Sequence, residues 1–162
     1  MHQVFLSIGG NLGNKRANFD KVYTHIQNEL GCIVLRSSVY ETPPWGFDSE
    51  DSFWNQVLCI ETLLNPSEIL EKIKKIDAAF GRKRNSEGYS SREMDVDILY
   101  FEDKIIETEN LTIPHPLLHK RLFVVVPLAE IAPDWVHPVL KLTSVDMLNN
   151  CEDKSEIKKV SE

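Results

Sequence analysis

The order in which strand-like and helix-like stretches follow one another constrains the fold of this chain most. Residues 4–8 and 32–40 are rich in strand-forming residues, and apolar residues at helical spacing lie between them. A second such set has strand-like residues 53–64, an apolar helical stripe over 69–80 and a strand over 94–101. This β-α-β-β-α-β order predicts an α+β fold with a ferredoxin-like antiparallel sheet that is covered by helices on one face.

The length of 162 residues suits one domain. We expect residues 1–150 to form that single domain, with a C-terminal annex of short helices and strands after the sheet. Within the annex, short helices are expected around 117–120 and 127–131. Residues 151–162 alternate charges with almost nothing to bury, which predicts a charged C-terminal tail, as a frayed helix or a loose coil.

Charge and cysteine content restrict the partners and the compartment of this protein. The net charge of −7 disfavours non-specific binding to nucleic acid or to an acidic membrane. No apolar run approaches the ~20 residues that cross a bilayer, and the first residues lack the pattern of a signal peptide. The three cysteines form no C-x-x-C pair and cannot all pair within one chain. We therefore expect a cytoplasmic protein with reduced thiols that neither binds nucleic acid nor enters a membrane, and a monomer.

Two aspartates in the last strand of the predicted sheet, Asp95 and Asp97, form the strongest candidate site. Side chains alternate along a strand, so both carboxylates point to one face, with their Cα atoms about 6.6–7 Å apart. Residues 98–101 are apolar, which indicates a central strand rather than a solvated acidic edge. Two acids so close repel each other unless a cation lies between them. The pattern therefore favours magnesium, held with water and substrate phosphates, or a pair of metal ions.

A basic loop precedes this strand in a chain that is acidic overall. It contains Arg82, Lys83, Arg84 and Arg92. A solvated surface loop would also have this composition, but guanidinium groups beside a metal site suit the oxygens of a polyphosphate. We therefore predict that a nucleotide carrying a pyrophosphate binds here and that the loop closes over it.

Two weaker signals leave alternatives open. Asp77 falls on the apolar stripe of the second helix, near the end where the helix dipole disfavours a carboxylate. It either pairs with a nearby arginine or faces a ligand. The glycine turn of residues 9–13 fits neither a dinucleotide-binding fingerprint nor a P-loop, because Ile8 stands where a glycine is needed and no Gly-Lys-Ser/Thr follows. Its glycines are expected to shape a tight strand-to-helix turn that can pack against a ligand.

An amide and several aromatic residues are candidates for holding a ring. They are Trp45 in a proline-stiffened loop, Phe53 and Asn55 on one strand face, and Phe123. Core packing explains any single aromatic residue. An amide beside aromatic rings, however, suits a flat heterocycle that is held by stacking and read at its edge. His115 and Arg121 are spaced to help bind phosphates, although a structural role explains His115 alone better.

Together these motifs resemble the 6-hydroxymethyl-7,8-dihydropterin pyrophosphokinase family of folate biosynthesis. The resemblance spans residues 4–134 and rests on segments 8–13, 40–46, 81–84, 92–98 and 113–116, together with Asn55. It implies that the chain is an ATP-dependent diphosphotransferase. The terminal pyrophosphate of ATP would pass to the hydroxymethyl group of the pterin, with release of AMP.

The resemblance also implies roles for individual residues. Asp95 and Asp97 would hold two magnesium ions and, with Arg82 and Arg92, form the catalytic set. Contacts to the pterin would come from Thr42, Pro43, Pro44, Trp45, Phe53, Asn55 and Phe123. Contacts to ATP would come from Asp77, Arg84, Arg92, Ile98, Thr112, His115 and Arg121.

The chain departs from the family pattern at positions that affect loop closure and ATP contacts. These are Tyr89, Asn110 and Pro116, where the family often has Trp, Arg and Tyr, and also Phe53 and Asp77, where Tyr and Glu are common. Two other classes of function remain open. Another metal-dependent phosphoryl or nucleotidyl transferase would need a broad basic groove for nucleic acid. A ligand-binding regulatory domain would need neither the paired carboxylates nor the arginine loop.

Overall fold

The computed structural model describes residues 1–42, 52–81 and 93–160. The elements follow the order expected from the sequence, except that the second β-rich stretch forms two strands. In chain order they are β1 (His2–Gly10), α1 (Lys15–Glu29), β2 (Cys32–Arg36), β3 (Tyr40–Thr42), β4 (Phe53–Thr62), α2 (Pro66–Ala79), β5 (Asp95–Phe101), β6 (Ile106–Glu107), β7 (Thr112–Ile113), the 3-10 helix η1 (Leu118–Lys120), α3 (Leu122–Ile131), α4 (Ser144–Asn150) and β8 (Lys158–Lys159).

The main sheet has the strand order β5-β1-β4-β3-β8, and β2 also pairs with β4. All of these pairs are antiparallel, as predicted. Strand β1 pairs with β4 on one side and with β5 on the other. The connections through α1 and α2 therefore each skip one strand, which places β1 and β4 in the middle of the sheet.

Local sequence signals set where α2 begins. Asn65 accepts a hydrogen bond from the Glu68 amide, and the Glu68 side chain accepts one from the Asn65 amide, which together form a capping box. Pro66 stands in the first turn, where its missing N–H costs nothing. The predicted helix start is confirmed. The helix buries Ile69, Ile73 and Ile76 against the sheet.

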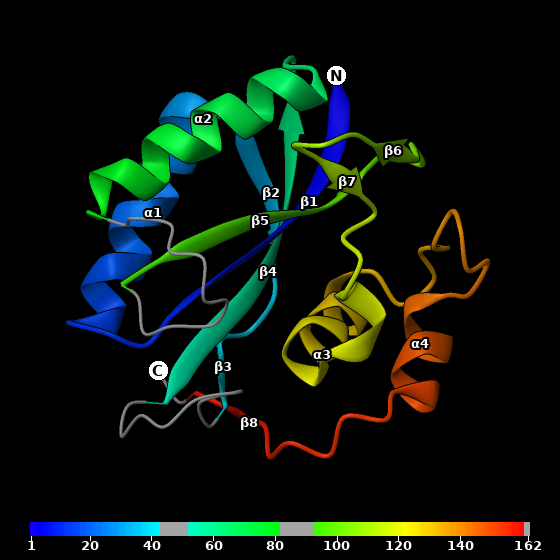
Figure 1. Ribbon diagram of the computed structural model, residues 1–162. Coiled ribbons are helices and arrows are strands. Elements are labelled where there is room, and N and C mark those ends of the chain that lie inside the picture. The colour runs from blue at the N-terminus through cyan, green and yellow to red at the C-terminus, as the bar shows by residue number, and fades with distance from the viewer. Residues whose placement is uncertain (43–51, 82–92, 161–162) are drawn as a thin grey trace.

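Helices cover both faces of the sheet rather than the one face expected. Helices α1 and α2 lie on one side and α3 and α4 on the other (Figure 1). The reason is that the strands also carry apolar residues on the face that points away from α1 and α2, and these residues are buried by α3. Phe5, Val57, Leu99 and Tyr100 form a second buried cluster with residues of α3. The C-terminal annex therefore supplies a second layer that the sheet needs.

The annex differs from the expectation in two places. Helix α3 begins at Leu122, five residues before the expected start at Pro127. Residues 151–160 include no helix, and β8 pairs with β3 at the sheet edge. Across the described residues, no helix is both long enough and apolar enough to span a bilayer.

Candidate functional site

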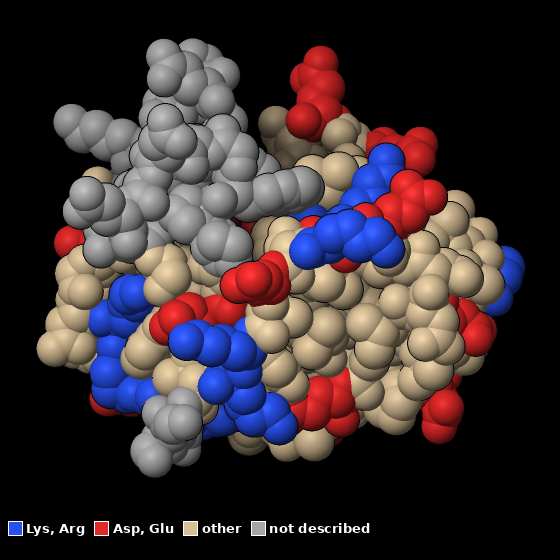
Figure 2. Space-filling view, turned by 90° about the horizontal axis from the view of Figure 1, so that it is seen from below, with Lys and Arg blue, Asp and Glu red and all other residues tan. Residues whose placement is uncertain are grey.

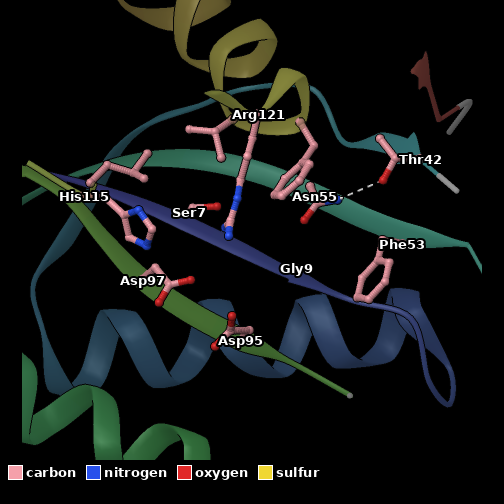
Figure 3. A pocket seen from close by; sticks show the side chains of 12 residues that line it. Ser7, Gly9, Thr42, Phe53, Asn55, Asp95, Asp97, His115 and Arg121 are labelled. Atoms are coloured by element: carbon pink, nitrogen blue, oxygen red, sulfur yellow. Dashed lines mark hydrogen bonds between the residues drawn. The ribbon is translucent and has the colours of Figure 1, made fainter. Parts of the chain in front are cut away.

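A pocket opens on the sheet face that α3 covers, with about 590 Å³ of empty space when the open solvent at its mouth is counted. Side chains from β1, β3, β4, β5 and α3 point into it (Figure 3). The lining residues are Ser7, Gly9, Thr42, Phe53, Asn55, Asp95, Asp97, Leu99, His115, Arg121, Phe123 and Val124.

The strand register aligns residues of β4, β1 and β5 that line the pocket. Gly9 on β1 lies opposite Asn55 on β4 and opposite Asp95 on β5. Two residues earlier on β1, Ser7 lies opposite Asp97. Because residues two apart share a sheet face, the carboxylates and the Asn55 amide all face the same cavity, separated by one strand.

The carboxylate end of the pocket is built by alternation along β5. Asp95 and Asp97 are partly exposed, whereas Val96 and Ile98 are buried on the opposite face of the sheet. The predicted common face of the two aspartates is confirmed. Among the described residues, no group of three or more His, Cys, Asp or Glu side chains could hold a metal ion. A cation at Asp95 and Asp97 would therefore need further oxygens from water or a substrate, as magnesium bound to phosphates does.

Two nitrogen-bearing side chains, His115 and Arg121, lie beside the carboxylates (Figure 3). The Leu117 amide donates a hydrogen bond of 3.1 Å to His115 Nδ1. This bond places the proton of a neutral ring on Nε2, which can then donate to a ligand. Burial lowers the pKa of Arg121 to about 10, so the guanidinium remains charged at neutral pH. An arginine in this setting presents a fixed fork of donors to anionic oxygens.

The other end of the pocket combines an amide with aromatic rings. Asn55 Nδ2 donates to Thr42 Oγ1 at 3.5 Å, and both side chains are buried. Phe53 lies opposite Thr42 across the β3–β4 pair and borders the cavity. Phe123 borders it from α3, with the Arg121 guanidinium carbon 5.4 Å from the centre of its ring. This end can hold a flat ring and read its polar edge.

The structure gathers most of the predicted site residues that it describes into this one pocket. Those that line it are Thr42, Phe53, Asn55, Asp95, Asp97, His115, Arg121 and Phe123. Three predicted ATP contacts do not line the pocket. Ile98 packs into the core on the opposite face, Asp77 is buried on α2, and Thr112 is exposed on β7. Pro43, Pro44, Trp45, Arg82, Arg84 and Arg92 lie outside the described residues.

The pocket is also lined by Ser7, Leu99 and Val124, which were not predicted, and by Gly9, which was expected only as part of a turn that can pack against a ligand. For Ser7, Gly9 and Leu99 the signal was the period of two along the strands, whereas Val124 lies on helix α3. Ser7 and Gly9 fall on the strand face opposite Leu6 and Ile8, and Leu99 continues the face of the two aspartates. The strand-to-helix turn expected over residues 9–13 is present but begins later, because β1 continues to Gly10 and α1 begins at Lys15.

The pocket thus has an anion-binding end next to paired carboxylates, and a ring-binding end one strand away. Such a site can place a polyphosphate, neutralised by a divalent cation and by Arg121, against a substituent of a bound ring. A group transfer that depends on positioning and charge stabilisation fits this layout better than one that needs a strong nucleophile of the protein.

Comparisons with known proteins match this chain to a family and to individual relatives that carry the same name. The family described as 7,8-dihydro-6-hydroxymethylpterin-pyrophosphokinase matches residues 5–133. The 2-amino-4-hydroxy-6-hydroxymethyldihydropteridine pyrophosphokinase of Aquifex aeolicus is 40% identical over 141 residues, which cover 87% of this chain and 87% of the relative. The enzyme of the same name from Methylorubrum extorquens is 40% identical over 137 residues, covering 84% and 86%.

A solved structure of a longer protein shares the fold. The crystal structure of Plasmodium falciparum HPPK-DHPS with pteroate has a TM-score of 0.73 and 17% sequence identity, and the match covers 92% of this chain and 42% of that one. At this identity the likeness concerns the fold alone. The chain spans less than half of that longer protein.

Proposed function

Because this chain belongs to the 7,8-dihydro-6-hydroxymethylpterin-pyrophosphokinase family, we propose that the pocket over β1 and β5 is where its two substrates meet. The chain transfers the terminal pyrophosphate of ATP to the hydroxymethyl group of 6-hydroxymethyl-7,8-dihydropterin, giving AMP and the pterin diphosphate. The observation that carries the assignment of the pocket is the register that aligns Asn55, Gly9 and Asp95 across three strands.

The pterin occupies the amide end. The Asn55 carboxamide and the Thr42 hydroxyl hydrogen-bond the polar edge of the ring, and Phe53 and Phe123 border its faces. These are side chains that a folded sheet and α3 hold in place before any substrate arrives. Such preorganisation fixes the direction in which the hydroxymethyl group points, toward the row of Asp95 and Asp97.

ATP occupies the other end, where Arg121 and the Nε2–H of His115 donate to its phosphates. Asp95 and Asp97 would hold two magnesium ions beside the same phosphates. Magnesium bound there would supply positive charge that offsets the charge of the transferred group. The hydroxymethyl oxygen bonds to the β-phosphorus and its proton is released to water. The bond from that phosphorus to the oxygen it shares with the α-phosphorus breaks, and AMP leaves with that oxygen.

The remaining predicted contacts belong to this proposal on the strength of the family resemblance. Arg82, Arg84 and Arg92 are proposed for the phosphates, and Pro43, Pro44 and Trp45 for the pterin. We also propose that Asp77, Ile98 and Thr112 contact ATP outside the lining of the pocket. For the fold, we propose a ferredoxin-like topology and a single domain over residues 1–150, followed by a C-terminal tail.

We further propose a cytoplasmic monomer. The three cysteines are free, with Cys59 buried and Cys32 exposed, which suits a reducing compartment. On the face seen in Figure 2, acidic and basic side chains lie side by side instead of forming a broad basic surface. This supports small-molecule substrates over nucleic acid.

One assay tests the proposed reaction against both alternatives. The protein is incubated with magnesium, ATP and 6-hydroxymethyl-7,8-dihydropterin, and the nucleotide and pterin products are separated by chromatography. We expect AMP and the pterin diphosphate in equal amounts. ADP as the main nucleotide product contradicts pyrophosphate transfer, and the absence of turnover with retained pterin binding favours a regulatory domain. Omitting the pterin is the control, and should give almost no AMP.

A further inference from the structure

The C-terminal segment, residues 151–160, contacts two elements that line the pocket, β3 and α3, instead of hanging free. Strand β8 pairs with β3, where Lys159 lies opposite Tyr40 and Lys158 opposite Glu41. The Val160 amide donates to the Val39 carbonyl oxygen at 2.8 Å. In Figure 1 this segment runs from α4 beneath α3 to the strand that ends in Thr42. One stretch of chain thus connects two elements that line the pocket.

Asp153 in this segment caps helix α3. The Leu122 amide donates a hydrogen bond of 3.0 Å to Asp153 Oδ2. The helix has no local cap, because the side chain of Arg121 at the N-cap position accepts no hydrogen bond. The first amides of a helix have no partner within it, and an aspartate satisfies one of them well because its charge also suits the positive end of the helix dipole.

The Asp153 carboxylate is itself held in place. Its other oxygen, Oδ1, accepts hydrogen bonds from the Ser155 amide at 2.8 Å and from the Ser155 hydroxyl at 2.6 Å. Burial alone would raise the pKa of this carboxyl, but the hydrogen bonds from Ser155 and Leu122 outweigh it and hold the pKa below its ordinary value. The cap is therefore ionised at neutral pH.

The capped amide lies between two side chains that line the pocket. Leu122 follows Arg121, whose guanidinium lies at the phosphate end, and precedes Phe123, which borders the ring end. We propose that Asp153 is a positioning residue that fixes the start of α3 and thereby holds Arg121 and Phe123 toward both substrates. This inference rests on the proposed function, which assigns ATP and the pterin to those two side chains.

Steady-state kinetics and amide hydrogen exchange of the full chain test this role. In Asp153→Ala we expect the KM for ATP and for the pterin each to rise about fivefold, the effect of losing one helix cap, with kcat changed less than about twofold. Exchange at the Leu122 amide, followed by NMR, should accelerate by a similar factor, about fivefold. Asp153→Asn keeps one acceptor oxygen for the Leu122 amide but places an NH2 group toward Ser155, so both readouts should lie between the wild-type and the Asp153→Ala values.

Glu152→Ala is the matched control, because it removes an exposed acid one residue away. It should leave KM and Leu122 exchange at wild-type values. Wild-type KM and exchange in Asp153→Ala would overturn the proposal, as would equal KM values in the Asn and Ala variants. If Asp153→Ala does not fold, Ser155→Ala replaces it: a raised KM supports the positioning role and an unchanged KM overturns it. Failure of the proposed function appears separately, as absence of turnover in the wild-type chain.

Discussion

Gly9 on β1 lies so close to Asn55 on β4 that a methyl group at residue 9 would overlap the Asn55 carboxamide oxygen. The same methyl group would lie 2.8 Å from the backbone oxygen of Trp54 and 3.1 Å from Asn55 Cγ. The missing side chain at residue 9 is therefore what allows the amide to occupy the floor of the pocket.

Gly9→Ala should displace the Asn55 amide and weaken pterin binding. We expect the dissociation constant of the pterin to rise about tenfold, equivalent to ~1.4 kcal/mol, measured by calorimetry. The overpacking should also lower the free energy of unfolding by about 1–3 kcal/mol in urea titrations.

A double-mutant cycle with Asn55→Ala separates displacement of the amide from general damage. If Gly9→Ala acts by moving the amide, adding Asn55→Ala should weaken pterin binding little further, so the two effects are not additive. Fully additive losses would show that Gly9 affects binding by another route.

Asp97→Asn should abolish most of the magnesium-dependent turnover while the chain still folds. Loss of one carboxylate removes a ligand for the cation that offsets phosphate charge, so we expect kcat to fall about 100-fold or more. Without magnesium, the variant should be at least as stable as wild type, because it removes repulsion between neighbouring carboxylates. Turnover and urea unfolding are measured with and without magnesium.

Glu93→Gln provides the control for the change of charge. Glu93 is exposed, two residues before Asp95, and does not line the pocket. Its substitution should keep wild-type kcat and wild-type dependence on magnesium. Near-normal turnover in Asp97→Asn would remove the metal assignment from this strand.

The site could be predicted from the sequence where it depends on one strand. Alternation along residues 94–101 is enough to put Asp95 and Asp97 on one face, because the geometry of a strand is local. Their neighbours across the sheet could not be derived this way. The contact of Gly9 with Asn55 depends on a register between strands that are more than forty residues apart in the chain.

The structure of the C-terminal annex also depends on contacts between residues that are distant in the sequence. Pro127 suggested a helix start, yet α3 begins at Leu122, where the cap comes from Asp153 on a distant segment. The charged residues 151–160 have little to bury, but backbone hydrogen bonds to β3 give part of them a strand conformation. In both places the conformation depends on residues that are far away in the sequence, so a local sequence pattern does not predict it.

Arg121→Lys should make ATP binding sensitive to pH. Burial lowers the pKa of Arg121 to about 10, which leaves the arginine charged throughout the neutral range. The same burial would lower the pKa of a lysine at this position below its ordinary ~10.4, toward the neutral range. The ammonium is charged below that pKa, so ATP affinity should fall as pH rises from 7 to 9, whereas wild-type affinity changes little.

The dissociation constant of a non-hydrolysable ATP analogue at pH 6.5, 7.5 and 9 measures this effect. Lys120→Arg is the control, since Lys120 is exposed and outside the pocket lining. A flat pH profile in Arg121→Lys would show that residue 121 does not contact the phosphates through its charge.

His137→Asn should remove part of the acid sensitivity of the fold. His137 Nδ1 accepts hydrogen bonds from the Val139 amide at 3.2 Å and the Leu140 amide at 3.0 Å, which requires this nitrogen to be unprotonated. Burial, and then the charge of nearby His119, lower the pKa of His137 to about 4. The unfolded chain, with a histidine pKa of about 6.5, therefore binds more protons between pH 6.5 and 4, and stability falls as pH decreases through this window.

The full effect of this histidine amounts to about 3 kcal/mol at and below the folded pKa. An asparagine side-chain oxygen can accept the same amide hydrogen bonds without titrating, so His137→Asn should lose less stability than wild type between pH 6.5 and 4. Urea unfolding at pH 7, 5.5 and 4.5 compares the two slopes. The wild-type slope includes His119, whose pKa is also lowered, first by burial and then by Lys120, so the variant should retain a smaller slope of the same sign. Equal slopes in the two proteins would mean that groups other than His137 cause the loss of stability in acid.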